Sequence, residues 1–290
     1  MNKIAFFYSL FCDNNISNSI RYLIPFIKNV KLYNSEKMLD NNMFIILHTD
    51  DFTFNIIKRI AKQEEVSLEN IIVKIHKRNL YLRGMIWRFE SFYTNEYDIC
   101  VNAEGDWPIE KYFGQLELIK NSNYNYILHD VRQFNINKNC FAAGNFIIKP
   151  SCLSNIEKHK IQLITNLIDN VEQVHYGVDE EFFVNLCKKF LSDKFGLIII
   201  HDNMRIFQHV ENFEEEKNYI KQAFQNQDIF CVGSIRYNLN YNKPQELKYL
   251  KENSYILENN TIEFKNPLRV PKNEWCNTEL VEIINIILNS

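Results

Sequence analysis

Short apolar runs alternate along this chain with longer segments in which apolar residues recur every three or four positions. Strands that alternate with helices of roughly 10–15 residues are typical of βαβ units, which build parallel sheets. The expected strands are 3–11, 43–48, 70–75, 97–102, 124–128, 144–149 and 197–201. The expected helices include 17–28, 82–93, 108–119, 151–171 and 178–191. We therefore expect an α/β fold with a mostly parallel central sheet flanked by helices.

One more helix is expected after the second strand. Asp51 is expected to cap it, and Phe54, Ile57 and Ile60 share one of its faces. The chain shows no internal repeat and no low-complexity linker. We therefore expect one domain over 1–290, with 236–290 as a C-terminal extension packed on it. The last helix of that extension is expected at 277–288.

Length and composition exclude several classes of protein. The 290 residues are 46% hydrophobic and 24% charged, which suffices for a sizeable core. A formal net charge of −3 gives no electrostatic case for a nucleic-acid partner. The seven cysteines form no Cys-x-x-Cys pair, so we expect reduced thiols and a cytoplasmic protein. No apolar run approaches about 18 residues, so we expect no transmembrane segment, and we expect no signal peptide.

The stretch 97–106 contains the strongest candidate for a functional site. A β-branched run ends there in two carboxylates, Glu104 and Asp106, separated by Gly105. In α/β proteins, ligands bind at the carboxyl ends of strands. Two such acids can face one cation, the glycine lets the backbone approach it, and carboxylate oxygens suit a hard divalent ion that holds a diphosphate. The alternative is a solvated acidic turn, because Gly-Asp is common turn chemistry.

Two further segments place polar groups at expected element ends. Asp179 follows Tyr176 and Gly177 at the start of an amphipathic helix, where a carboxylate also stabilises the helix dipole. His201 and Asp202 follow a strongly apolar strand. A strand-end histidine suits a metal, although it is more often a hydrogen-bonded edge residue. Each segment by itself is a weak indication of function.

In their order along the chain, these segments resemble GT-A type glycosyltransferases, and most closely a group from bacteria and large viruses. Members of that group carry Trp-Arg-Phe, an Asp-x-Asp strand end, a Gly-rich strand, Tyr-Gly-x-Asp-Gln and a strand-end His-Asp. The matching segments here are 85–89, 104–106, 142–146, 176–180 and 201–202, and 230–233 is similar to a later segment of the group. The resemblance covers roughly residues 3–240 and is specific in order and spacing, less so in identity.

The resemblance implies a single GT-A, Rossmann-like domain that transfers a sugar from a UDP- or GDP-linked donor to an acceptor hydroxyl on a glycan or protein. It implies Mn²⁺ or Mg²⁺ held by Glu104, Asp106 and His201, which would neutralise the leaving diphosphate. Asp179 would be the catalytic residue, as the base of an inverting enzyme or as a stabiliser of positive charge in a retaining one. Arg88 would pair with the diphosphate or orient Glu104.

The resemblance also implies binding residues. The backbone around Tyr8 and Ser9 would hold the nucleoside, with the Tyr8 ring stacked on the base or serving as one more core aromatic. The other implied positions are Gly144 and Asn145 for the donor, and Trp107, His129 and Asp130 for the acceptor.

Two departures from the group's pattern leave alternatives open. Glu104 replaces the first Asp and keeps its charge on a side chain one methylene longer. In an alternative register, Ala103 and Gly105 occupy the acid positions, and the metal site is lost. Glu180 replaces the usual Gln and places a second negative charge beside Asp179, which could raise the pKa of either carboxylate.

Two other function classes compete with glycosyl transfer. A degenerate GT-A fold would serve as a non-catalytic binding or scaffold protein. A nucleotidyltransferase shares the fold type and the metal-binding acids, but usually has a Gly-rich, basic loop after its first strand. Residues 10–15 are Leu-Phe-Cys-Asp-Asn-Asn, without Lys or Arg, which argues against that class.

Overall fold

The structure is a computed structural model with two compact units. The first unit comprises Met1–Ile109, Ile148–Asp179 and Glu274–Ser290, and the second comprises Glu110–Ile147 and Glu180–Asn273. The described residues are 2–12, 16–77, 82–132, 139–141, 143–170, 179, 182–183, 186–191, 193–201, 229–232, 235–238, 254–257, 261–264 and 286–287. A single domain over 1–290 stays a prediction.

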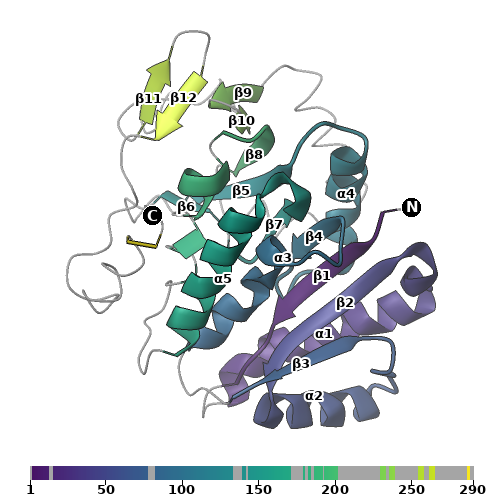
Figure 1. The fold of residues 1–290 in the computed structure, drawn as a ribbon. Helices are drawn as coiled ribbons and strands as arrows, with labels where there is room; N and C mark the ends of the chain where they lie inside the picture. The colour runs from purple at the N-terminus through teal and green to yellow at the C-terminus, as the bar shows by residue number, and fades with distance from the viewer. Residues whose placement is uncertain are drawn as a thin grey trace. The chain divides into compact units, whose positions relative to one another are not determined.

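The first unit contains four parallel strands in the order β3-β2-β1-β4 (Figure 1). These strands are β1 (Ile4–Ser9), β2 (Met43–Asp50), β3 (Ile72–His76) and β4 (Ile99–Asn102). Ile4 of β1 pairs with Met43 on one side and with Ile99 on the other. The apolar residues of β1 and β4 are buried, as expected for strands that are covered on both faces.

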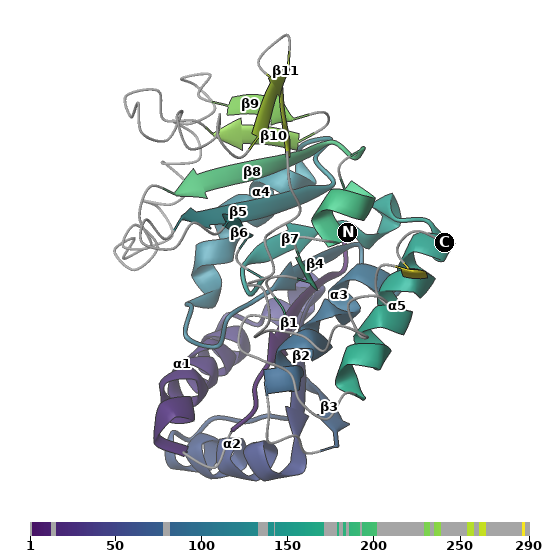
Figure 2. The ribbon, with the colours of Figure 1, turned by 90° about the vertical axis from the view of Figure 1, so that its left-hand side faces the viewer.

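Helices cover both faces of this sheet (Figures 1 and 2). On one face lie α1 (Ile16–Ser35) and α2 (Asp51–Gln63), and on the other lie α3 (Glu90–Tyr93) and α5 (Asn155–Asp169). The 3₁₀ segments are η1 (Met38–Asn41), η2 (Leu82–Phe89) and η4 (Pro150–Cys152). Within the described ranges, no helix combines the length and the apolar character needed to cross a membrane.

Side-chain caps set the starts of α2 and α5. Asp50 is the N-cap of α2, because its side chain accepts a hydrogen bond of 2.7 Å from the Thr53 backbone N–H. The prediction that Asp51 caps this helix is wrong, because β2 continues to Asp50 and the cap therefore moves back by one residue. At α5, Ser154 and Glu157 form a capping box.

The helix expected at 82–93 is instead η2 followed by the single turn α3. Apolar spacing does not distinguish 3₁₀ from α geometry in so short a segment. η2 passes close to the end of β1: the Ser9 hydroxyl donates a hydrogen bond to the Gly84 carbonyl, and a Cβ on Gly84 would lie 2.5 Å from Phe11 Cδ1. Gly84 therefore allows an approach that a larger residue would block.

The second unit has a mixed sheet. β5 is parallel to β8, and β8 is parallel to β10, whereas β6 and β9 are antiparallel to β5 and β10. The strands are β5 (Tyr126–Arg132), β6 (Asn139–Phe141), β7 (Phe146–Ile148, whose last residue belongs to the first unit), β8 (Gly196–His201), β9 (Ile229–Val232) and β10 (Ile235–Asn238), with a separate pair, β11 (Ser254–Leu257) and β12 (Thr261–Phe264). The helical segments are η3 (Ile109–Tyr112), which begins in the first unit, α4 (Phe113–Lys120) and the π-helical η5 (Cys187–Leu191).

The predicted fold class, α/β with a mostly parallel sheet flanked by helices, is confirmed by this strand pairing. The expected helix at 277–288 lies outside the described residues, except for helical Ile286 and Ile287.

Candidate functional site

The strand order of the first unit reverses at β1. The chain runs from β1 to β2 and β3 on one side and then returns to place β4 on the other. In open α/β sheets, ligands bind outside the carboxyl ends of the strands at such a switch point. β1 ends at Ser9 and β4 at Asn102, and the Ala103 N–H still bonds the Phe7 carbonyl at 2.9 Å. Residues 103–106 therefore leave the sheet at the switch point.

The acidic motif forms a tight turn there. Glu104 is partly exposed and Asp106 is exposed, while Gly105 between them is buried. A Cβ on Gly105 would lie 2.7 Å from Leu10 Cδ2 and 3.0 Å from the Tyr22 carbonyl oxygen. The glycine therefore permits the close approach of this turn to α1.

A buried arginine joins two of the predicted site residues. Arg88 Nη1 lies 3.0 Å from Glu104 Oε1, and Arg88 Nη2 lies 2.9 Å from Asp179 Oδ2. Arg88 and Asp179 are 5% and 3% exposed, so the second ion pair is almost fully removed from water. We call Arg88, Glu104 and Asp179 the switch-point cluster.

Electrostatics hold Arg88 in its charged form. Burial lowers the pKa of the guanidinium, but the charges of Glu104 and Asp179 and their hydrogen bonds more than compensate, so the pKa of Arg88 is raised. Of the two roles expected for Arg88, this geometry favours orienting Glu104, because both terminal nitrogens of the guanidinium already bond carboxylates.

Asn29 of α1 bonds the backbone just after the acidic turn, a role that was not predicted from the sequence. Its Nδ2 donates to the Trp107 carbonyl at 2.7 Å, and its Oδ1 accepts from the Ile109 N–H at 3.1 Å. Asn29 is 5% exposed. The signal that was available is an amide on the buried side of an amphipathic helix, where a polar group needs partners.

The end of β1 is held by its neighbours. Leu10 N–H donates to the His48 carbonyl at 2.9 Å, and Cys12 N–H donates to Thr53 Oγ1 at 2.8 Å. Tyr8 is fully buried, and its ring meets the Phe26 ring edge-on at 5.0 Å. Tyr8 therefore packs in the core, which matches the alternative of a core aromatic.

Several predicted binding residues lie in the second unit. Asn145 is buried and accepts a hydrogen bond from the Tyr112 hydroxyl, and Gly144 beside it is also buried. His129 is 1% exposed and its Nε2 lies 2.9 Å from Gln115 Oε1. Burial lowers the pKa of His129 to about 3, so this ring is neutral near pH 7.

Asp130 and His201 belong to β5 and β8, but their side chains lie outside the described residues. Across the described part of the chain, no three His, Cys, Asp or Glu side chains gather closely enough to hold a metal. The metal site with Glu104, Asp106 and His201 therefore stays a prediction.

No protein-family model matches the chain, and no curated protein matches it. Among solved structures, the chain is similar to the crystal structure of 4-diphosphocytidyl-2C-methyl-D-erythritol synthase from Anaerococcus prevotii, at 9% identity and a TM-score of 0.40. The similarity covers 75% of this chain and 97% of that chain. At this identity, what the chain does has to be inferred from its own site.

Proposed function

We propose that this protein transfers a sugar from a UDP- or GDP-linked donor to a hydroxyl of a glycan or protein acceptor. The observation that carries the proposal is the switch-point cluster, in which a buried arginine pairs with two carboxylates. Glu104 of the cluster lies where the strand order reverses, the position at which α/β proteins bind nucleotides. Burying charges is costly, and such clusters are concentrated at functional sites.

The acidic turn fits a divalent cation by its chemistry. Asp106 is exposed, and Glu104, two residues before it, bonds Arg88 through Oε1. A carboxylate can serve an arginine and a cation through its two oxygens. Mn²⁺ and Mg²⁺ accept such oxygens together with waters and substrate phosphates. When bound, the metal would neutralise the charge that develops on the departing diphosphate.

Asp179 is the proposed catalytic residue. Its Oδ2 bonds Arg88, so Oδ1 is the atom that would face substrate. In an inverting reaction, Asp179 would accept the proton of the acceptor hydroxyl as the new glycosidic bond forms. In a retaining reaction, it would stabilise the positive charge on the sugar. Arg88 would keep the carboxylate in place in either case.

Nucleotidyl transfer is the second candidate. The solved neighbour is named for a diphosphocytidyl product, which is closer to this class than to glycosyl transfer, although a TM-score of 0.40 does not decide between them. Residues 10–12 after β1 contain no Lys or Arg, and Arg88 is already paired with two carboxylates. A triphosphate would need more positive charge than these residues supply.

Product analysis separates the candidates. A glycosyltransferase releases UDP or GDP from a nucleotide sugar. A nucleotidyltransferase instead transfers the nucleotidyl group of a nucleoside triphosphate to a sugar phosphate and releases pyrophosphate. We expect release of UDP or GDP. Release of pyrophosphate alone would show that the protein is a nucleotidyltransferase instead. Tight nucleotide binding without either reaction would identify a scaffold protein.

Asp106→Ala tests the acidic turn. In calorimetric titrations with UDP or GDP and Mn²⁺, we expect affinity to fall by about 10- to 100-fold, because the metal loses a charged ligand. The matched control is Asp40→Ala, since Asp40 is an exposed acid in η1, ahead of the amino end of β2. Unchanged affinity in Asp106→Ala would show that the carboxylate assignment is wrong. Equal binding of the wild type in EDTA would favour the register without a metal site.

A further inference from the structure

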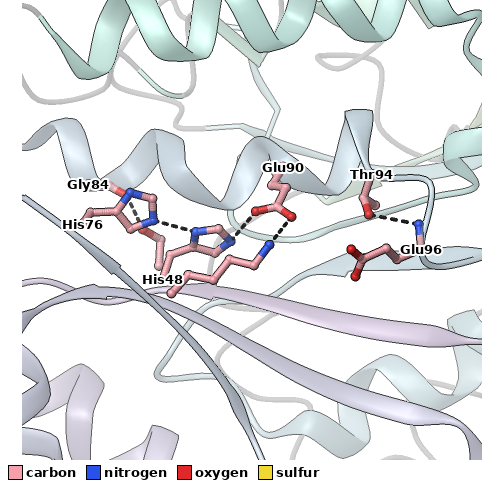
Figure 3. Close-up of polar contacts among 8 residues, drawn as sticks. His48, His76, Gly84, Glu90, Thr94 and Glu96 are labelled. Carbon is pink, nitrogen blue, oxygen red and sulfur yellow. Dashed lines mark hydrogen bonds and ion pairs between the residues drawn. The ribbon is translucent and has the colours of Figure 1, made fainter.

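A chain of polar contacts that the proposed function does not use joins the strand ends to α3 (Figure 3). His48 Nδ1 of β2 lies 2.9 Å from His76 Nε2 of β3. His48 Nε2 lies 3.5 Å from Glu90 Oε2, and Lys74 Nζ contacts the other oxygen of the same carboxylate. Residues from two neighbouring strands therefore hold Glu90, the first residue of α3.

The same histidine pair also contacts η2. The His76 ring stacks on Trp87 with centroids 4.2 Å apart and planes 7° apart, and Trp87 Nε1 donates to Asp169 Oδ1 of α5 at 2.6 Å. Trp87 directly precedes Arg88, whose guanidinium binds Glu104 and Asp179. The position of η2 therefore determines where the guanidinium of Arg88 lies.

The His48–His76 contact needs one N–H and one lone pair. If His76 Nε2 donates, His48 Nδ1 accepts, and the N–H on His48 Nε2 faces the Glu90 carboxylate. Both rings are neutral in this arrangement. If both rings were protonated, two N–H groups would face each other across 2.9 Å, and the hydrogen bond would be lost.

The surroundings keep both rings neutral. Burial lowers the pKa of His48 well below its ordinary value, and the charges of His76 and Lys74 lower it further. Burial also lowers the pKa of His76, with Asp169 opposing the shift and Lys74 adding to it. The charged and titratable groups that face the pair are Lys74, Glu90 and Asp169, with Tyr93 close to Glu90 and Asp169.

We propose that the His48–His76 pair is a pH-dependent latch, which holds η2 on the strand ends when both rings are neutral and releases it when the pair takes up protons. The latch is independent of the proposed function, because it concerns opening of η2 in the protein without ligand. Its direction follows from linkage: folding disfavours the protonated rings, so the latch holds above about pH 6.5 and weakens as the pH falls below that value.

Hydrogen exchange of the full chain from about pH 8 to about pH 5, corrected for intrinsic exchange, tests the latch. The peptide 82–93 should lose protection by about tenfold or more in acid, while Ile4–Tyr8 of the buried β1 keeps its protection. Trp87 fluorescence should change over the same range, because release of η2 separates the buried indole from the His76 ring and exposes it to water. The difference between wild type and Trp87→Phe isolates this signal from the other two tryptophans.

His76→Gln is the decisive variant, because its amide can still donate to His48 but does not titrate. We expect 82–93 to stay protected in acid in this variant, whereas His159→Gln, at an exposed histidine of α5, should behave as wild type. If His76→Gln does not fold, His48→Asn serves in its place. Three results would each overturn the latch. They are unchanged protection of 82–93 in the wild type at acid pH, a loss of protection in His76→Gln equal to that of the wild type, and a loss of protection in β1 at the same pH as in 82–93.

Discussion

Among single residues, Arg88 has the widest consequences. One positive charge serves two carboxylates that come from distant parts of the chain, 16 and 91 positions away. Removing either partner of a buried ion pair leaves a charge without compensation, which costs more than the pair itself contributes. The cluster is therefore sensitive to substitution whatever reaction it supports, and a test of catalysis must keep its shape.

Asp179→Asn meets that requirement, because an amide oxygen can still accept a hydrogen bond from Arg88. If Asp179 is the base or the stabilising charge, turnover should fall by about 10²- to 10⁴-fold while donor affinity is retained. Release of UDP or GDP and calorimetry measure the two quantities. The matched control is Asp193→Asn, at an exposed acid that forms an ion pair with its neighbour Lys194. Turnover equal to wild type in Asp179→Asn would remove Asp179 from the mechanism.

At the scale of elements, the ends of strands and helices matter more than their middles. The apolar middles of β1, β2 and β4 lie where the pattern of the sequence places them. The functional groups lie just after the apolar residues of these strands. If a strand ends one residue earlier or later, a different side chain caps the next helix or faces a ligand. The α2 cap is an example, because Asp50 and Asp51 are chemically the same and only one accepts from Thr53.

Asp50→Ala should lower the free energy of unfolding by about 1 kcal/mol, the usual cost of losing an N-cap side chain. Asp51→Ala is the natural control, since it removes only a helix-dipole interaction of about 0.3–1 kcal/mol. Urea unfolding followed by circular dichroism measures both changes. A larger loss in Asp51→Ala than in Asp50→Ala would contradict the cap observed in the structure.

The sequence was sufficient for the fold class and for the strand end that carries Glu104 and Asp106, because burial on both faces demands continuous apolar runs. It was not sufficient for contacts that depend on tertiary packing. Nothing in the local pattern links Arg88 to Asp179, and His48 and His76 do not form a recognisable motif. Tyr8 shows the same difficulty, since a core aromatic and a base-stacking aromatic have the same residue type.

At the scale of the whole molecule, buried neutral histidines make stability depend on pH. His48 is 1% exposed in the first unit, and His129 is 1% exposed in the second. Burial lowers the pKa of each, and that of His129 falls to about 3. A histidine with a lowered folded pKa contributes fully above its unfolded pKa of about 6.5, and its contribution declines as the pH falls toward the folded value.

His129→Gln should make stability less dependent on pH. Between about pH 7.5 and pH 5, His129 accounts for a loss of about 2 kcal/mol, because the unfolded chain takes up a proton that the folded chain refuses. In the variant, the free energy of unfolding should no longer include this loss between the two pH values, even if the variant is less stable than wild type at pH 7.5. Urea titrations at both pH values measure the difference, with His159→Gln as an exposed control. An unchanged slope in His129→Gln would contradict a buried neutral imidazole.

The shared guanidinium of Arg88 also limits how this chain can diverge. The carboxylate of Glu104 lies 3.0 Å from Arg88 Nη1, and replacing Glu104 with Asp would shorten that side chain by one methylene and move the carboxylate away. Arg88 Nη2 would still bond Asp179. A substitution at any one of these three positions therefore destabilises the cluster until the other two positions also change. Descendants that keep this site should inherit positions 88, 104 and 179 as a block, and those that abandon it should lose all three within a few steps.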